Sequence, residues 1–252
     1  SFNKMIRRLN DLVISEYQAK DELQKAEISE QKMAMLYLKQ QINPHFLYNT
    51  LDMIRLKAAI NKDTEVSQML MKLVSFYRLS TKVYDSMVAV RKEVEMLDAY
   101  MSLMCYRYSD IIYRSEIEPG ALDIEIPNFI LQPLLENSLM HGLKDRRYQG
   151  TIILKIYRNE QDKNELNIWL IDDGIGIPDD KMAELNAYNA KDSEALYRVQ
   201  TRTEGDRTHL GVINVISRLK LYYQENAEVI YMRNETGGTT VKIKIKTASE
   251  ET

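Results

Sequence analysis

The sequence has little cysteine and proline, and its first part has no glycine at all. Of its 252 residues one is a cysteine, Cys105, five are prolines, and all nine glycines lie at residue 120 or later. A single cysteine excludes an intramolecular disulfide framework and a cysteine-rich zinc site, and it fits a reducing compartment such as the cytoplasm. Because Leu, Met, Lys, Glu, Gln and Ala are frequent in residues 1–119, we predict a helical N-terminal part followed by a mixed part.

Long apolar runs and an excess of basic side chains are also missing. No apolar run reaches the roughly eighteen residues that a membrane-spanning helix needs, and the N-terminus lacks the layout of a signal peptide. Lys and Arg number 34 against 37 Asp and Glu, so direct binding to nucleic acid is not expected. With 44% hydrophobic residues, the chain can form a sizeable core, and its length predicts two folded units. Residues 1–8 enter a helical pattern at once, as expected for a fragment of a longer protein.

The first part of the chain shows a seven-residue repeat within residues 2–42. The repeated apolar residues are Met5, Leu12, Ala19, Ala26 and Met33. This spacing favours a parallel coiled coil, and glutamates in its second seam make a shift of register easier. An amphipathic helix predicted over residues 65–82 would pair with the first helix as an antiparallel hairpin, and two hairpins would form a four-helix bundle in a dimer.

The rest of the chain carries both helix and strand patterns, which predict an α+β fold. Helices are expected over residues 91–107, 129–143 and 212–223. Strands are expected over residues 111–117, 122–126, 152–157, 166–171, 229–233 and 240–246. The segment 179–209 is polar and weakly patterned, and connections of that length usually act as lids or are disordered.

His45 follows a proline within this helical first part. Pro44 lacks an amide hydrogen, and its ring would collide with the carbonyl of Gln40, so we expect the helix to kink and to present the imidazole. A neutral imidazole is a competent nucleophile near neutral pH. On its own, a Pro-His pair is more often a helix bend with a solvated histidine.

Two later motifs are suited to a nucleotide. Asp172 follows an apolar strand and precedes Gly174 and Gly176, a spacing that allows a tight turn and close backbone approach. The Asp172 carboxylate can accept a hydrogen bond from an exocyclic amine such as that of adenine. Glu136 and Asn137 offer oxygen ligands of the kind that Mg2+ prefers. An ordinary strand-end turn and a solvated helix face would look the same.

Gly211 lies where the polar segment enters a predicted helix. A glycine at such a junction would let backbone amides reach a phosphate at the helix N-terminus, although a simple helix start is the alternative. The pair Gly237-Gly238 is interpreted as a structural hairpin. The informative feature is therefore the order of these motifs along the chain.

Two segments carry a resemblance to a known family. Residues 41–51 read QINPHFLYNTL, and residues 132–142 read QPLLENSLMHG. With these segments the chain resembles the YesM/LytS-type sensor histidine kinases of bacteria over nearly its whole length. The resemblance implies a long dimeric coiled coil and helical hairpin followed by a Bergerat-fold ATP-binding sandwich, the fold shared with gyrase, Hsp90 and MutL. The implied domains are a signalling helix similar to the exit helix of a HAMP domain (1–30), a dimerisation and phosphotransfer hairpin (31–84) and a catalytic ATP-binding domain (85–252).

The resemblance also implies roles for individual residues. His45 would be the phosphoacceptor, Asn137 the Mg2+ ligand and Asp172 the residue that reads adenine. The positions that match the nucleotide loops are Gly174, Gly176, Gly211 and Asn214. His141, one helical turn beyond Asn137, is expected to pack or orient rather than react. Asn49, one turn after His45, would position a water that removes phosphate from a partner, or would simply pack the helix.

Several positions depart from the family pattern. Met140 stands where many relatives have a lysine available to the phosphates, and His209 stands at the first glycine of the second glycine box. The residues that could replace the lysine are Lys144, Arg198, Arg202 and Arg207. We therefore predict ATP binding that is weaker than in ordinary histidine kinases or depends on the lid. Phe46 follows the phosphoacceptor where many other histidine kinases have an acidic residue, so the proton acceptor must come from elsewhere.

The expected function is that of a sensor histidine kinase of a two-component system. It would phosphorylate His45 from Mg2+ and ATP as a homodimer and pass the phosphoryl group to a response-regulator receiver domain. The full-length protein would be membrane-anchored through segments absent from this chain, which would be its cytoplasmic portion. Pro133 replaces the glutamate that activates water in ATP-hydrolysing relatives, so simple hydrolysis is disfavoured. The alternative is a dimeric nucleotide-binding scaffold without phosphotransfer.

Overall fold

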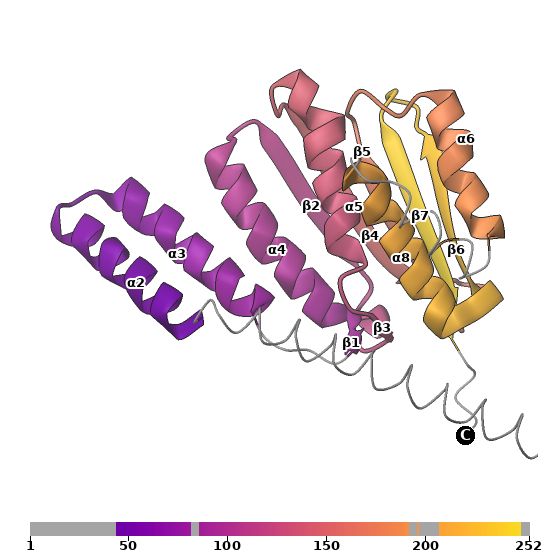
Figure 1. Ribbon diagram of the computed structural model, residues 1–252, viewed down its shortest axis with the longest axis horizontal. Coiled ribbons are helices and arrows are strands. Elements are labelled where there is room, and N and C mark those ends of the chain that lie inside the picture. The colour runs from indigo at the N-terminus through magenta and orange to yellow at the C-terminus, as the bar shows by residue number, and fades with distance from the viewer. Residues whose placement is uncertain (1–43, 82–85, 192–195, 197–206, 248–252) are drawn as a thin grey trace, which may run out of the picture.

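The computed structural model describes residues 44–81, 86–191, 196 and 207–247 (Figure 1). The coiled coil predicted within residues 2–42, and the kink predicted just before His45, lie outside these residues. In the part of the chain that is described, no helix is both long enough and apolar enough to cross a membrane.

The chain begins its described course with a helical hairpin. Helix α2 spans Pro44–Ile60 and helix α3 spans Thr64–Ser80, close to the helix predicted over residues 65–82. The Asp63 carboxylate caps α3 by accepting the Val66 N–H at 3.0 Å, which ends the turn between the two helices.

A five-stranded sheet forms the second part in the order β2-β4-β5-β7-β6. The strands are β2 (Ile111–Ile117), β4 (Gly150–Arg158), β5 (Glu165–Asp172), β6 (Ala227–Arg233) and β7 (Thr239–Lys246). Strands β2 and β4 are parallel, and the other neighbours are antiparallel. Each of these strands was predicted, because apolar side chains on one face alternate along them with more exposed ones.

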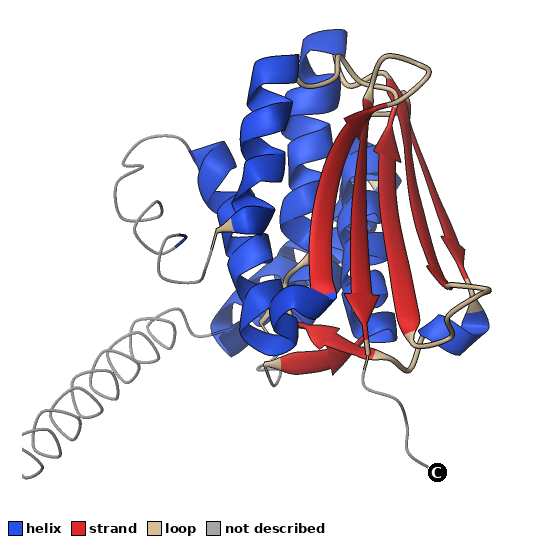
Figure 2. Ribbon diagram, turned by 90° about the vertical axis from the view of Figure 1, so that its right-hand side faces the viewer, coloured by secondary structure: helices blue, strands red, loops and turns tan. Residues whose placement is uncertain are grey.

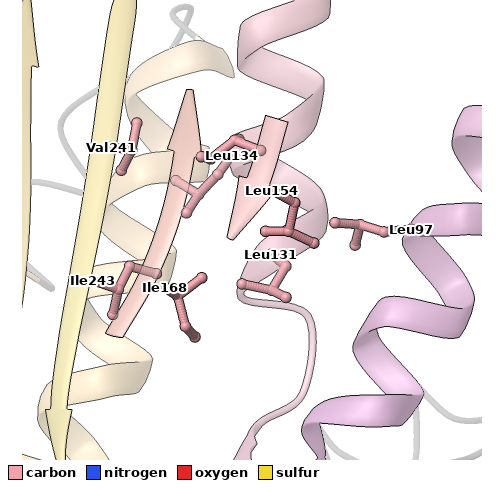
Figure 3. Close-up of a pocket in the computed structure, with 8 residues that line it drawn as sticks. Leu97, Leu131, Leu134, Leu154, Ile168, Val241 and Ile243 are labelled. Carbon is pink, nitrogen blue, oxygen red and sulfur yellow. The ribbon is translucent and has the colours of Figure 1, made fainter. Parts of the chain in front are cut away.

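Helices α4 (Val90–Arg107), α5 (Leu131–Asn137) and α8 (Arg207–Tyr223) cover one face of the sheet (Figure 2). The side chains between these layers form a single apolar core. A gap of about 10 Å³ remains within it, lined by leucine, isoleucine and valine from α4, α5 and three strands (Figure 3). A gap so small and apolar fits neither a nucleotide nor a well-bonded water, so the functional site lies elsewhere.

The structure corrects two predicted elements that lie between β2 and β4 in the sequence. The strand expected over residues 122–126 is a 3-10 turn at Pro119–Ala121 followed by the short strand β3 (Glu125–Pro127), because a Pro-Gly pair starts a turn here. Strand β3 pairs antiparallel with β1 (Met87–Ala89) in a separate two-stranded sheet. The helix expected over residues 129–143 is α5 followed by a π-helix, Ser138–Leu143.

The predicted lid also needs correction in its first part. Residues expected to be a loop form helix α6 (Asp179–Ala187) and a 3-10 turn, Tyr188–Ala190. Pro178 precedes the helix, and acidic side chains in its first turn suit the positive helix end. Periodicity missed α6 because Leu185 is its single buried residue. Most of the remaining lid, residues 192–195 and 197–206, lies outside the described residues.

Two asparagines of this segment cover the outer edge of β6. The Asn186 amide donates to the Tyr231 carbonyl at 2.9 Å and accepts the Tyr231 N–H at 2.8 Å. The Asn189 amide makes the same pair of bonds with Val229, at 2.6 and 3.1 Å. The side chains thus satisfy backbone groups that an edge strand would otherwise offer to another chain.

The hairpin packs on the second part through α3. The Lys72 ammonium donates to Ser102 Oγ at 2.6 Å, and the ring centroids of Phe76 and Tyr100 lie 5.4 Å apart. The Tyr106 hydroxyl, near the end of α4, donates to the Glu65 carbonyl at 2.8 Å. Helix α3 therefore lies between α2 and α4 (Figure 1).

Candidate nucleotide site

Asp172 ends strand β5 and is 2% exposed. Its Oδ1 accepts the backbone N–H groups of Gly174 at 3.0 Å and Thr239 at 3.1 Å. Its Oδ2 accepts the Ser138 hydroxyl at 2.8 Å. A carboxylate oxygen has two lone-pair directions, so Oδ2 retains one for a donor on a ligand. Asp172 is thus held as an oriented acceptor, while its role as the residue that reads adenine stays a prediction.

Burial raises the pKa of Asp172 above its usual value, and the neighbouring Asp173 adds to this effect. The hydrogen bonds from Ser138, Thr239 and Gly174 oppose the rise, since they favour the ionised carboxylate. These three bonds therefore support the charge form that can accept a hydrogen bond from an amine.

Glycines surround Asp172 because side chains would not fit. A Cβ on Gly174 would lie 2.5 Å from the Gly142 carbonyl oxygen, and one on Gly238 would lie 2.1 Å from the Asp172 carbonyl oxygen. A Cβ on Gly142 would lie 3.2 Å from Asp172 Oδ1. The hairpin containing Gly238, interpreted from sequence as structural, packs against the backbone of Asp172 and Gly174.

Gly176 has a positive φ of 74°, which favours glycine, and a Cβ there would lie 2.4 Å from the Gly237 carbonyl oxygen. The Ile175 N–H donates to the Gly142 carbonyl at 3.1 Å, so the turn after β5 is tied to the π-helix. Gly174 and Gly176 therefore provide the tight turn and close backbone approach that the sequence predicted.

Asn137 is the last residue of α5 and is half-buried. Ser138 follows it directly, so the expected metal ligand and the partner of Asp172 are adjacent in sequence. His141 is exposed in the π-helix, and Lys144 is exposed in the 3-10 turn that follows it. Asn137, His141 and Lys144 are thus near neighbours in sequence of Ser138 and Gly142, the two residues of this stretch that approach the Asp172 carboxylate.

The start of α5 is fixed by a buried carboxylate that sequence reasoning did not single out. Glu93 is 0% exposed, and it accepts the N–H groups of Phe129 at 2.7 Å, Ile130 at 3.1 Å and Leu131 at 3.1 Å. Desolvation raises the pKa of Glu93, while these three bonds and the nearby Arg218 oppose the rise. Because α5 is only seven residues long, fixing its start also places Asn137 at its end.

Arg146, a basic residue beside the turn after β5, was not among the predicted replacements for the family lysine. Arg146 donates to the Asp173 carbonyl, and its guanidinium lies 3.5 Å from the Asp173 carboxylate. Met140 is 47% exposed, and its sulfur accepts the Tyr148 hydroxyl at 3.9 Å. Of the predicted replacements for the family lysine, Arg198 and Arg202 lie outside the described residues, whereas Arg207 begins α8.

The prediction for Gly211 is wrong in one respect. Helix α8 begins at Arg207 rather than at residue 212, so Gly211 lies inside the helix and its N–H is not at the helix N-terminus. A Cβ on Gly211 would lie 3.7 Å from the Pro133 side chain, so this face of α8 packs on α5. Asn214 is exposed one turn further along α8.

The phosphoacceptor candidate is not brought to this site within one chain. His45 is the second residue of α2, and Asn49 is exposed one turn later. Phe46, which follows His45, is 68% exposed. Helix α3 separates this helix from α4 and from the part of the chain that carries Asp172 (Figure 1).

Sequence reasoning missed the partners that position Asp172 and Asn137. These are Ser138, Thr239, Glu93 and Asn234, whose amide donates to the Asp172 carbonyl at 2.7 Å. A local sequence motif could not reveal them, because each lies 34 or more residues away from its hydrogen-bond partner in the sequence. The only local signal was a small hydroxyl residue, Ser138, next to the expected metal ligand.

The site fits a nucleotide with its magnesium ion. Asp172 offers a buried acceptor for a base, glycines leave room for close backbone approach, and Asn137 offers an oxygen ligand. Within the described ranges, no cluster of three His, Cys, Asp or Glu side chains could hold a metal ion. A magnesium ion at Asn137 would therefore depend on phosphate oxygens for further ligands.

Two family models match the chain. The model described as "Histidine kinase" matches residues 33–112. The model described as "Histidine kinase-, DNA gyrase B-, and HSP90-like ATPase" matches residues 123–249. The first match contains His45, and the second contains Asn137 and Asp172.

Individual relatives are similar over most of this chain. The sensor protein LytS of Oceanobacillus iheyensis is 32% identical over 82% of this chain and 33% of its own length. The sensor histidine kinase YpdA of Escherichia coli is 27% identical over 85% of this chain and 34% of its own length. The chain thus spans about a third of these two relatives. Among solved structures, the histidine kinase domain of a blue-light activated histidine kinase from Erythrobacter litoralis EL346 aligns with a TM-score of 0.43 and 18% identity, over 77% of this chain and 84% of that one.

Proposed function

The chain belongs to the histidine kinase-, DNA gyrase B- and HSP90-like ATPases, and within them to the LytS type of histidine kinase, and we propose that it transfers the γ-phosphoryl group of ATP to its own His45. The observation that carries the proposal is the oriented, buried Asp172 carboxylate in a glycine cradle, on the same chain as the histidine segment. Asp172 would accept the adenine amine, and Asn137 would hold Mg2+, which neutralises phosphate charge when bound.

In the proposed reaction, a ring nitrogen of His45 forms a bond to the γ-phosphorus as the bond from that phosphorus to the bridging oxygen of ADP breaks. The phosphorylated imidazole then loses its remaining ring proton to a base. Phe46 cannot accept that proton, so the base belongs to another part of the assembly or to solvent. Pro133 likewise offers no group to activate water, which favours transfer over hydrolysis.

A homodimer is supported by the apolar surface of the hairpin. The exposed apolar side chains on α2 and α3 are Phe46, Met53, Ile54, Leu56, Ile60, Val66, Met69 and Met71. Exposed apolar surface on this scale usually marks an interaction site, and a second hairpin would bury it in a four-helix bundle. We propose that this face is the dimer interface.

The remaining partners follow from the family. We propose that phosphorylated His45 passes its phosphoryl group to the aspartate of a response-regulator receiver domain. The relatives' greater length supports a full protein that anchors this portion to the cell membrane on the cytoplasmic side through other segments. A signal received there would change the register of residues 2–42 and so the access of the ATP-binding part to His45.

Labelling with γ-labelled ATP and Mg2+ tests the proposed reaction. We expect acid-labile, base-stable label on the protein that is absent from His45→Ala and Asp172→Asn and is prevented by a magnesium chelator. Label that persists in folded His45→Ala would overturn the assignment of the acceptor. Folding of each variant is checked by its unfolding temperature.

A nucleotide-binding scaffold without phosphotransfer is the second candidate, and the structure offers one feature in its favour. Met140, with its sulfur bonded to Tyr148, provides no cation where relatives offer a lysine to the phosphates. The scaffold predicts nucleotide binding without label in the wild-type dimer and in the full-length protein exposed to its signal.

Asn49 is proposed to assist removal of phosphate from the receiver domain. It is exposed one helical turn after His45, where its amide could orient a water. We expect Asn49→Ala to keep phosphorylation of His45 and to slow dephosphorylation of the receiver. Unchanged dephosphorylation would leave Asn49 with a packing role.

A further inference from the structure

We propose that Ser138 is a positioning residue that selects the nucleotide base by orienting the Asp172 carboxylate toward an exocyclic 6-amino group. The inference rests on the proposed ATP-dependent function. The proposed function names Asp172 as the contact for adenine, but it does not say which residue orients the Asp172 carboxylate for that contact.

The hydrogen bonds of Asp172 leave one direction open. Both lone-pair directions of Oδ1 are taken by the backbone N–H groups of Gly174 and Thr239. The Ser138 hydroxyl takes one direction of Oδ2 at 2.8 Å. A ligand donor can therefore bond only along the remaining direction of Oδ2, and the hydroxyl determines which direction that is.

The bond between Ser138 and Asp172 is buried. Ser138 is 5% exposed and Asp172 is 2% exposed, so their bond is shielded from bulk water. Gly142 packs against the same carboxylate, since even a Cβ there would lie 3.2 Å from Oδ1. Without the Ser138 hydroxyl, both lone-pair directions of Asp172 Oδ2 would lack a donor. The carboxylate would then lose the hydrogen bond that orients Oδ2, the oxygen proposed to face the base.

The hydrogen bond from Ser138 to Asp172 connects the residue proposed to contact the base with the segment that carries the proposed Mg2+ ligand. Ser138 starts the π-helix directly after Asn137, the last residue of α5. The backbone that carries the proposed Mg2+ ligand therefore also carries the donor that orients Asp172. A nucleotide held by both groups would have its base and its phosphates positioned by two consecutive residues.

The expected specificity follows from hydrogen-bond polarity. A 6-amino purine presents an N–H donor to Asp172 Oδ2. A 6-oxo purine presents a carbonyl oxygen there, and two acceptors cannot form a hydrogen bond with each other. A purine without a 6-substituent makes neither contact. Ser138 should therefore strengthen the binding of ATP while leaving the binding of the unsubstituted analogue unchanged.

Equilibrium binding measures this effect directly. The dissociation constants of ATP, inosine triphosphate and purine ribonucleoside triphosphate are measured with Mg2+ for the intact chain, Ser138→Ala, Ser138→Thr and the control Ser102→Ala. We expect Ser138→Ala to weaken ATP binding about tenfold, with unchanged binding of the unsubstituted analogue. Ser138→Thr, which keeps the hydroxyl, and Ser102→Ala, on α4, should retain the ATP preference.

Each outcome decides the inference. An equal loss for ATP and the unsubstituted analogue in Ser138→Ala would show a merely structural role, and an unchanged ATP preference would show no role; either overturns the proposal. Analogue binding serves as the internal control for folding. If the wild-type chain binds none of the three nucleotides, the proposed function fails as well, whereas ATP binding that is insensitive to Ser138 defeats the inference alone.

Discussion

Two buried carboxylates, Asp172 and Glu93, organise the site at the residue scale. Both accept hydrogen bonds from backbone amides of segments far away in sequence. Asp172 is the residue proposed to accept the adenine amine, while Glu93 fixes the start of the helix that ends at Asn137. In the proposed function, one carboxylate would therefore read the base, and the other would hold the proposed metal ligand in place.

The pKa of Glu93 predicts a dependence of stability on pH. Because burial raises this pKa in the folded state above its usual 4.5, the group stabilises the fold at low pH and loses that contribution as pH rises through the folded value. As pH rises from the usual pKa through the raised pKa of folded Glu93, we expect the free energy of unfolding of the wild type to fall relative to that of Glu93→Gln, which cannot ionise. Denaturant unfolding at a series of pH values measures the difference. Parallel pH profiles for the two proteins would contradict the expectation.

Gly174 should not tolerate even a methyl group. A Cβ there would lie 2.5 Å from a backbone oxygen of Gly142, so Gly174→Ala must displace the turn beside Asp172. We expect a loss of about 1–3 kcal/mol in the free energy of unfolding together with weaker ATP binding. Gly120→Ala is the matched control, since its nearest neighbour would be a side-chain oxygen 3.7 Å away. Equal behaviour of the two variants in unfolding and binding assays would refute the close-approach argument.

Part of the site could be predicted because its chemistry is local. Asp172, Gly174 and Gly176 form one strand-to-turn pattern, and the structure confirms their close approach. Ser138 and Thr239 could not be found in this way, because their bonds to Asp172 depend on the folded arrangement of the π-helix and β7. Local spacing therefore predicts the acceptor but not the groups that orient it.

At the scale of helices and strands, the spacing of apolar residues and the local composition predicted the regular elements of the sheet. The strand at residues 111–117 has the predicted bounds, because its apolar pattern is bounded by turns. The π-helix Ser138–Leu143 was read as ordinary helix, since both share an apolar pattern and differ only in hydrogen bonding. Helix α6 escaped prediction because Leu185 is its single buried residue and its hydrogen bonds to β6 are made by the Asn186 amide.

Removing these amides should expose the edge of β6. We expect the double variant Asn186→Ala with Asn189→Ala to self-associate with rising concentration, because four backbone groups of Tyr231 and Val229 lose their partners. Sedimentation analysis measures the association beyond the dimer. Asn61→Ala, on the exposed hairpin turn, is the control. Equal association of both variants would mean that the edge needs no such cover.

At the scale of the whole molecule, the arrangement of α2, α3 and α4 bears most on function. Helix α3 lies between the helix that begins beside His45 and the part that carries Asp172 (Figure 1). In the proposed reaction, the phosphoryl group would therefore reach His45 after the two parts move, or would cross to the hairpin of a second subunit in the proposed dimer. The contacts of Lys72, Phe76 and Tyr106 hold the observed arrangement.

Loosening this contact should change the reaction rate. Phe76→Ala removes the aromatic contact with Tyr100, and we expect the initial rate of His45 phosphorylation to rise several-fold if the packed arrangement restrains the ATP-binding part. Gln68→Ala, exposed on the same helix, is the control. The initial rate is measured with labelled ATP at equal nucleotide saturation. A rate that is unchanged or reduced in Phe76→Ala alone would show that the contact does not restrain transfer.

The measurement that tests the account most directly is a single-turnover balance of ADP, free phosphate and protein-bound phosphate. The wild-type protein is mixed with a limiting amount of γ-labelled ATP and Mg2+, with His45→Ala as the control. Transfer to His45 predicts that protein-bound phosphate equals the ADP formed, with no free phosphate at early times and no bound phosphate in His45→Ala. Free phosphate that appears in step with ADP, without phosphate on the protein, would contradict the assignment of this chain as a kinase that uses its own histidine.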